Sequence, residues 1–237
     1  KWRKENVQVN PQVDYERIRI DNSVFNDISG DENEIKLNIP SGWRKTRMGE
    51  VFDVQVGATP SRKVDEYWNG KFAWVSSGEV RFEAIDETTE YITEAGLNNS
   101  STNLQPIGTV LLAMIGEGKT RGQAAILNIP AAHNQNTAAI LVSKTPCMPK
   151  YIYYFLLLNY DNTRRVGSGN NQKALNKERV KAIHFPFCSF AEQEIIVQEI
   201  ESRLSVCEQV EKCAEWALQQ AEALRQSIVK KAFPGGL

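Results

Sequence analysis

Three loops of this chain combine glycine, small polar residues and positive charge, which suits them to bind nucleic acid. Lys and Arg neutralise phosphates, Arg, Asn and Gln can hydrogen-bond to base edges, and glycine lets backbone amides approach closely. These loops contain GATPS at 57–61, GEGKTRG at 116–122 and GSGNNQ at 167–172. For any single residue, an ordinary exposed polar side chain is the competing interpretation, so the set carries more weight than its members. The candidate DNA-contacting residues are Ser61, Arg62, Lys63, Lys71, Lys119, Thr120, Arg121, Arg164, Arg165, Asn171, Gln172 and Lys173.

The same loops do not fit the phosphate-binding motifs of enzymes. A Walker A loop needs glycine six residues before its lysine, where Ala113 precedes Lys119, and a dinucleotide fingerprint needs glycine in place of Arg121. The chain also lacks a G-x-S-x-G elbow, an H-E-x-x-H motif and the Asn/Asp-Pro-Pro-Tyr/Phe motif of amino-methyltransferases. We therefore expect no catalytic residues, and a tight glycine hairpin at 116–122 that presents Lys119 and Arg121.

The cysteines and histidines do not have the spacing of a metal site. The four cysteines form no C-x-x-C pair, and the two histidines, His133 and His184, lie far from any such pair. We expect no metal and no cofactor in this chain. The sequence also has no export signal and no apolar run of about 18 residues, so we expect reduced thiols, a cytoplasmic location and no membrane contact.

The charge is distributed unevenly, although the net charge is only −1. Residues 1–40 contain 6 Lys and Arg against 8 Asp and Glu, residues 41–187 contain 17 against 13, and residues 188–237 contain 5 against 8. The middle section is thus mildly basic and the last section acidic. A solvated mixed surface explains this difference about as well as a nucleic-acid site does.

The apolar pattern predicts an α+β fold for the middle section, residues 41–187. Buried strands are expected at 72–75, 109–115, 123–127, 137–142 and 182–185, because these short runs are apolar and β-branched and lie between turn signals. Pro149 opens a helix whose apolar residues follow three- and four-residue steps, and residues 159–162 end it. Residues 1–40 are polar and are expected to be mostly linker.

Residues 188–237 predict one long helix and a short tail. Ser189 and Glu192 fit a capping box, and neither glycine nor proline follows until Pro234. Apolar or small residues then alternate in steps of four and three, apart from Arg203, which favours a coiled coil with another long helix. A helix folded along its own domain is the alternative. The expected helix-pairing residues are Ile196, Ile200, Cys207, Val210, Ala214, Ala217, Ala221, Leu224 and Ile228.

A series of short motifs resembles the specificity subunits of type I restriction–modification systems. Each motif is short, but they occur in the family's order over about residues 36–237. They are PSGW at 40–43 with Met48-Gly49, GATP at 57–60, YWNG at 67–70 before Trp74, IGTVL at 107–111, Gly118-Lys119, AAI at 124–126, Asn134-Gln135, YIYY at 151–154, GS at 167–168, Gln172, EQ at 192–193, IV at 196–197, SI at 227–228, AF at 232–233 and GL at 236–237.

The resemblance implies a target-recognition domain at 41–187 and a distal conserved helix at 188–237. KWR at 1–3 is similar to the tail of a preceding central helix, so the chain resembles a C-terminal half of such a subunit. The family's role is to read one half of a split DNA site without catalysis. Its partners are a modification subunit that uses S-adenosylmethionine, a restriction subunit that uses ATP and Mg, and a second half-subunit or a second copy paired through the long helix.

Two other functions remain open from the sequence. One is a coiled-coil interaction module that organises a protein complex without binding DNA. The other is a small nuclease or hydrolase whose site has no recognisable motif. Convergence of the loop cations would favour DNA binding, whereas a cluster of carboxylates around a metal would favour the enzyme.

Overall fold

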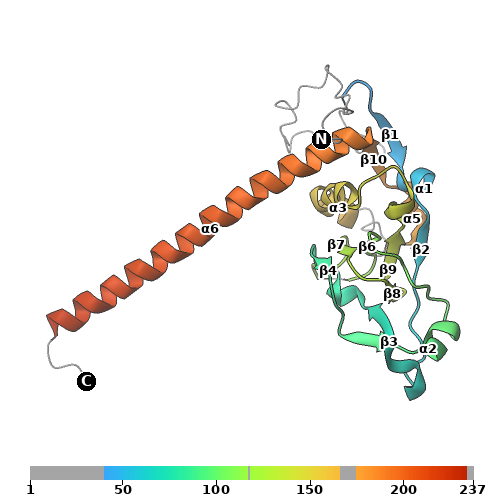
Figure 1. The fold of residues 1–237 in the computed structure, drawn as a ribbon, viewed down its shortest axis with the longest axis horizontal. Helices are drawn as coiled ribbons and strands as arrows, with labels where there is room; N and C mark the ends of the chain where they lie inside the picture. Colours follow the sequence, from blue (N-terminus) through green and yellow to red (C-terminus); the bar gives the residue numbers. More distant parts are fainter. Residues whose placement is uncertain (1–39, 117, 166–174, 234–237) are drawn as a thin grey trace, which may run out of the picture. The chain divides into compact units, whose positions relative to one another are not determined.

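A computed structural model describes residues 40–116, 118–165 and 175–233, and structural statements below concern those residues. Residues 1–40, expected to be linker, lie almost entirely outside them. Contacts divide the chain into two compact units, Lys1–Glu194 and Ile195–Leu237. The first unit contains mixed sheets with short helices, and the second is part of one long helix, so the fold is α+β as expected (Figure 1).

The centre of the first unit is a five-stranded sheet in the order β2-β9-β6-β7-β4. Its strands are β2 (Val54–Val56), β9 (Thr137–Ile140), β6 (Val110–Ala113), β7 (Ala124–Leu127) and β4 (Ala84–Ile85). β6 is antiparallel to both β7 and β9, with Leu111 opposite Ala125 and Ala139. All four residues of β6 are fully buried, because large side chains on one strand face alanines on its neighbours.

The first unit also contains two smaller sheets. The three-stranded sheet has the order β5-β3-β8, formed by β5 (Glu90–Ile92), β3 (Trp68–Val75) and β8 (Ala131–His133). The two-stranded sheet pairs β1 (Arg44–Arg47) with β10 (His184–Phe187). Parallel pairing of β3 with β8 places Val75 opposite His133. This register brings the GATPS loop, which precedes β3 in the chain, beside the end of β8.

Short helices cover and connect the sheets. α3 (Pro149–Leu158) packs on β6 and β7, and α4 (Tyr160–Arg165) follows it after a single residue. α1 (Met48–Val51) packs on α5 (Lys177–Ala182), while α2 (Glu94–Asn98) lies beside β3. Single 3₁₀ turns occur at Asp65–Tyr67, Ser77–Glu79 and Val142–Lys144.

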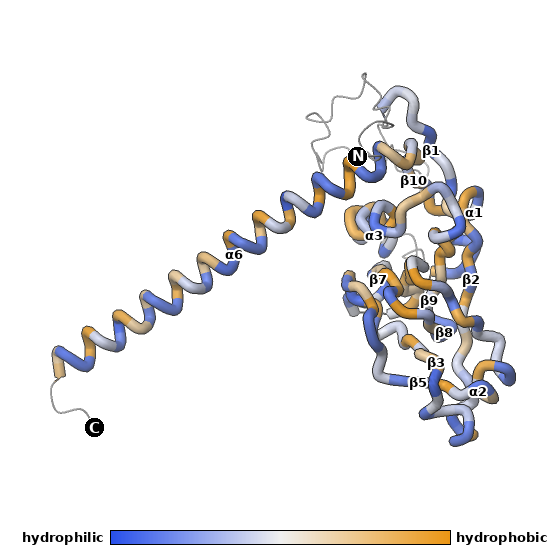
Figure 2. The backbone as a smooth tube through the Cα atoms, viewed as in Figure 1, coloured by the Kyte–Doolittle hydropathy of each residue, from blue (hydrophilic) through white to orange (hydrophobic). Residues whose placement is uncertain are grey.

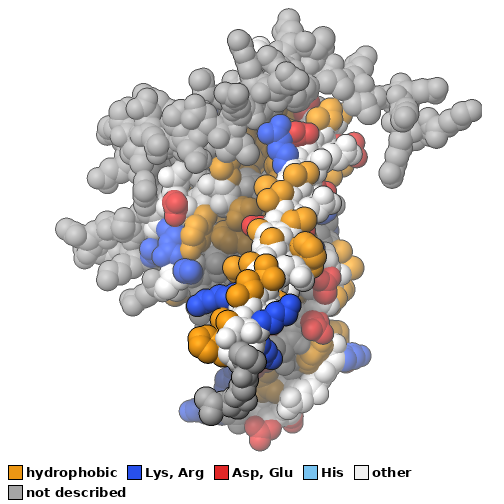
Figure 3. Space-filling view, turned by 90° about the vertical axis from the view of Figure 1, so that its left-hand side faces the viewer, with side chains coloured by type: hydrophobic (Ala, Val, Ile, Leu, Met, Phe, Trp, Pro, Cys, Tyr) orange, Lys and Arg blue, Asp and Glu red, His pale blue; other side chains and the backbone are white. Residues whose placement is uncertain are grey.

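α6 (Phe190–Ala232) begins at the capping box that the sequence predicts. Ser189 N donates to Glu192 Oε2 at 3.0 Å, and Glu192 N donates to Ser189 Oγ at 3.3 Å. With 43 residues the helix is about 64 Å long at 1.5 Å per residue. Every side chain at 202–233 is exposed in the single chain. Hydrophobic residues recur along the length of this helix (Figures 2 and 3).

The structure confirms most of the expected elements and corrects some of their ends. β3, β6, β7 and β9 contain or overlap the expected strands, and α3 begins at Pro149. The strand expected at 182–185 begins only at His184, because α5 continues to Ala182. Residues 159–162 do end α3, but Tyr160 also starts α4, which the sequence analysis missed. It also missed β1, β2, β4, β5 and β8, of which all but the four-residue β1 are two or three residues long.

Candidate nucleic-acid interface

The turn between β6 and β7 presents Lys119 to solvent. β6 and β7 pair as an antiparallel hairpin, as the sequence predicts. Gly116 and Gly122 adopt φ of +147° and +86°, a conformation that side chains disfavour, so glycine is required at both ends of the turn. The Lys119 side chain is exposed, and no described carboxylate pairs with it. A lysine held in this way can neutralise a phosphate.

α4 lies against this turn. Arg164 Nη2 donates to Gly118 O at 2.7 Å, and Arg121 Nη2 donates to Arg164 O at 3.1 Å. The Tyr160 hydroxyl donates to Lys119 O. The fold therefore brings Arg164 to the consecutive residues 119–121, which lie about 45 residues earlier in the sequence.

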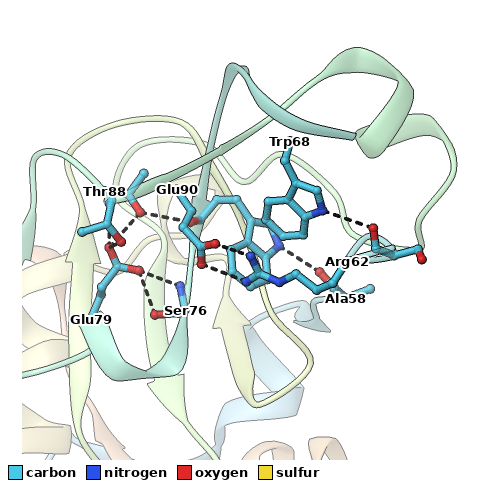
Figure 4. Close-up of polar contacts among 10 residues, drawn as sticks. Ala58, Arg62, Trp68, Ser76, Glu79, Thr88 and Glu90 are labelled. Atoms are coloured by element: carbon cyan, nitrogen blue, oxygen red, sulfur yellow. Dashed lines mark hydrogen bonds and ion pairs between the residues drawn. The ribbon is translucent and has the colours of Figure 1, made fainter. Parts of the chain in front are cut away.

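Arg62 lies in a different group, where its charge is already paired. Both of its terminal nitrogens donate to the Glu90 carboxylate, with Nη2 at 2.9 Å from Oε2. Its guanidinium also stacks 3.7 Å from the Trp68 ring centroid (Figure 4). The hydrogen bonds that Arg62 donates to Glu90 raise the pKa of Arg62. Because Glu90 satisfies the bidentate face of the guanidinium, Arg62 contributes less free positive charge than its neighbour Lys63.

Trp68 and Trp74 form the base on which Arg62 rests. The two rings meet edge to face, with centroids 5.2 Å apart. Trp68 Nε1 donates to Ser61 O at 3.2 Å, and Trp74 Nε1 donates to Ala58 O at 3.0 Å. Both indoles thus fix the backbone of the GATPS loop, and Ser61 at its end and Lys63 just after it are exposed.

Lys71 is exposed on β3, three residues after Trp68. The strand pair is irregular between Trp68 and Phe72, where Asn69 adopts φ of +60°. A Cβ on Gly70 would lie 2.4 Å from Ile92 O, so this position needs glycine. The irregularity is what a bulge produces: it changes the direction of the strand locally and presents Lys71 to solvent.

The Glu79 carboxylate binds the two residues that precede β5. It accepts hydrogen bonds from Ser76 N at 2.8 Å, Thr88 Oγ1 at 2.8 Å and Thr89 N at 3.0 Å (Figure 4). Burial acts to raise its pKa, but these donors outweigh burial, and the pKa of Glu79 is lowered. In all, five donors from residues 76, 88 and 89 bind this carboxylate, so it links the backbone segments on which they lie.

His133 anchors the start of the GATPS loop. Ala58 N donates to His133 O at 2.9 Å, and a Cβ on Gly57 would lie 1.9 Å from the same oxygen. The fully buried ring has Nδ1 2.7 Å from Thr137 Oγ1, while its Nε2 has no partner. Burial lowers the pKa of His133 to about 4, so the ring is neutral near pH 7.

The arrangement of acids, cysteines and histidines offers no metal centre within the described ranges. No three such side chains are grouped there as ligands. Cys147 and Cys188 are buried and burial raises the pKa of both thiols, to about 12 for Cys188, whereas Cys207 and Cys213 are exposed on α6. Across the same residues, no helix is both long and apolar enough to cross a bilayer.

Comparison with known proteins identifies the family. The family described as the type I restriction modification DNA specificity domain matches residues 40–212. This span includes both groups of loop cations and the first half of α6. The chain belongs to this family.

Two curated members of the type I specificity family resemble the chain at low identity. The EcoR124I/EcoR124II specificity subunit of Escherichia coli is 25% identical over 155 residues, 64% of this chain and 38% of that protein. The MjaIX specificity subunit of Methanocaldococcus jannaschii is 26% identical over 163 residues, 67% of this chain and 37% of that protein. The matched part is therefore well under half the length of either relative.

Solved specificity subunits show the same fold. The HsdS subunit from Thermoanaerobacter tengcongensis matches with a TM-score of 0.61 at 19% identity, over 91% of this chain and 49% of that one. A chain from a structure titled for complex assembly and conformational transition of the type I R-M system matches with a TM-score of 0.67 at 18% identity, over 91% and 50%. The chain thus has the architecture of about half of such a subunit.

Some of the predicted DNA-contacting residues lie outside the residues that the structure describes. Asn171, Gln172 and Lys173 lie outside the described residues, as does the side chain of Arg165. Sequence reasoning missed Glu90 and Tyr160, which contact predicted residues, and Phe82, which packs on Tyr160. Tyr160 could have been found, because it lies four residues before Arg164 and faces the same side of a helix. Glu90 carries no local signal, since it meets Arg62 only through the pairing of β3 with β5.

Most of the expected helix-pairing residues are exposed on α6, whereas Ile196 and Ile200, near the start of the helix, are only partly exposed. Val210, Leu224 and Ile228 are 63%, 62% and 57% exposed, far more than isolated apolar residues on a stable surface helix require. Cys207, Ala214, Ala217 and Ala221 are exposed between them. Small residues at these positions would allow a second helix to approach closely.

Proposed function

We propose that this chain is a non-catalytic DNA-recognition subunit that reads one half of a bipartite sequence. The observation that carries the proposal is the match to the DNA specificity domain over residues 40–212. The exposed Lys63, Lys71 and Lys119 supply the chemistry, because each can neutralise a phosphate from a loop or an irregular strand. The family's name specifies DNA recognition and no catalytic activity.

The long helix would supply the partner contacts. Its exposed apolar positions at heptad spacing suit a second long helix, either from another half-subunit or from a second copy of this chain. In this proposal the modification subunit binds S-adenosylmethionine, and the restriction subunit binds ATP and Mg. The chain itself binds no cofactor, and the complex works in the cytoplasm.

Selection of bound sequences from a random DNA pool tests the proposal. The chain is incubated with the pool in the presence of the modification subunit, because half a recognition surface binds weakly alone. We expect enrichment of one short motif. Lys119→Ala should weaken binding and lower the salt slope by about one unit, the effect of one lost phosphate contact.

A matched control separates this contact from a general loss of charge. Lys144 is exposed on the Val142–Lys144 turn, outside the predicted interface, so Lys144→Ala removes the same charge elsewhere. We expect its salt slope to equal that of the wild type. Selection of no motif, with normal binding of the modification subunit, would favour the interaction module. Cleavage of DNA by the chain alone would favour the nuclease.

A further inference from the structure

The β6–β7 turn is held by two side chains of α4, and both of them contact its backbone. Arg164 Nη2 donates to Gly118 O at 2.7 Å, while its Nη1 donates to the Tyr160 hydroxyl. That hydroxyl in turn donates to Lys119 O. The two adjacent carbonyls of the turn therefore accept hydrogen bonds from one connected chain of donors, in which each bond polarises the next.

The turn also supplies a hydrogen-bond donor to α4. Arg121 Nη2 donates to Arg164 O at 3.1 Å, which closes a ring of interactions between the two segments. Gly122 permits the close approach, because a Cβ there would meet Arg164 Cγ at 3.2 Å and Tyr160 Cδ2 at 3.3 Å. Its φ of +86° disfavours any side chain independently.

An aromatic cluster fixes Tyr160 to β7. Phe82 meets the Tyr160 ring edge to face at 5.3 Å between centroids. Phe82 is itself held in the left-handed region at φ +59°, with its N–H donating to Ala124 O at 2.8 Å and its carbonyl accepting from the Tyr153 hydroxyl. A non-glycine residue persists in this conformation only when its surroundings impose it. The clamp is thus anchored in the sheet that ends at the turn.

We propose that Tyr160 and Arg164 are positioning residues that clamp the β6–β7 turn in one shape, so that DNA meets a preformed reading surface. The inference rests on the proposed function and adds the contacts that hold one part of the DNA-reading surface, the β6–β7 turn, in shape. It also changes the role of Arg164, whose two terminal nitrogens are committed to Gly118 and Tyr160. Preordering the turn avoids its ordering cost at the moment of binding, which improves affinity for the matching sequence.

Three substitutions separate a clamp from a phosphate contact. Tyr160→Phe removes only the hydroxyl and leaves the charge unchanged. Arg164→Lys keeps the charge but cannot make both hydrogen bonds in the same fork. Lys119→Gln removes a charge but preserves the clamp, because Lys119 enters the clamp only through its backbone carbonyl.

The experiment has one arm without DNA and one with it. Amide hydrogen exchange at residues 118–122 of the full chain is measured for each variant. Binding is measured, with the modification subunit present, to the duplex selected from the random pool and to a scrambled duplex of the same length, over a range of salt concentrations.

We expect faster exchange at 118–122 in Tyr160→Phe and Arg164→Lys. Both should bind the selected duplex about 5- to 10-fold more weakly, the scale of one lost hydrogen bond, with unchanged salt slope and unchanged affinity for the scrambled duplex. Lys119→Gln should show normal exchange and a salt slope lower by about one unit on both duplexes.

Either of two results would overturn the inference. Unchanged exchange in Tyr160→Phe and Arg164→Lys would show that the turn does not depend on the clamp. Equal losses on both duplexes in Arg164→Lys, at normal exchange, would make Arg164 a phosphate contact. Equal affinity of the wild type for the two duplexes would instead refute the proposed function, and the exchange arm would still decide the clamp.

Discussion

Protonation of His133 should destabilise the first unit of the chain under mildly acidic conditions. The ring is fully buried, its Nδ1 lies 2.7 Å from Thr137 Oγ1, and its Nε2 has no partner to accept or stabilise a proton. Burial accordingly lowers the pKa of His133 to about 4 in the folded chain, against 6.5 in the unfolded chain. Between these values the unfolded state binds a proton that the folded state does not.

The sign and size of the effect follow from this difference. The stability that a neutral His133 preserves is fully present above pH 6.5 and is lost as the pH falls towards 4. The pKa of His133 is about 2.5 lower in the folded chain than in the unfolded chain. This difference lowers the free energy of unfolding by about 3.4 kcal/mol well below pH 4, and by about 2 kcal/mol at pH 5. The free energy of unfolding should therefore fall steeply over a range in which most carboxylates remain ionised.

Urea unfolding at pH 4.5 to 7.5 measures the effect in the wild type and in His133→Asn. Asparagine does not titrate, and its side-chain amide can replace Nδ1 as the hydrogen-bond partner of Thr137. The loss of packing in the variant does not depend on pH. The pH dependence of the difference in unfolding free energy between the two proteins therefore reports the protonation of His133. A difference that stays flat within about 0.5 kcal/mol over this range would refute the reasoning.

Three further predictions use matched pairs of variants. Gly57→Ala should cost about 3 kcal/mol in urea unfolding, because its Cβ would lie 1.9 Å from His133 O, whereas Gly118→Ala, with nothing within 4 Å, should change stability by less than about 0.5 kcal/mol. Gln193→Leu should cost about 1–3 kcal/mol in the same assay, since it leaves Met148 N and Cys188 O without partners, whereas Gln198→Leu on the exposed helix surface should not. Ala217→Glu should weaken self-association or pairing in sedimentation velocity, whereas Gln219→Glu, about 200° around the helix, should not. Equal effects of the two members of any pair would contradict the contact invoked.

The sequence determined the features whose signals are local. The capping box joins Ser189 to Glu192, only three residues further on, and the heptads of α6 repeat with one exception at Arg203, so both appear without tertiary information. The β6–β7 hairpin is similar, because two apolar runs flank a glycine-rich turn. Strands of two or three residues, such as β4 and β8, fall below the length at which periodicity is visible.

Only the tertiary structure decided what each loop cation does. Arg62 and Lys63 are neighbours in sequence, yet one is paired with Glu90 across a strand pair and the other is exposed. Likewise the Lys119 side chain faces solvent, whereas the Arg164 guanidinium donates a hydrogen bond to the backbone of the neighbouring turn. The residue types show that these groups can bind phosphate. Whether a charge is free to do so depends on which distant donors and acceptors the fold brings within about 3 Å, because a hydrogen bond acts only at that range.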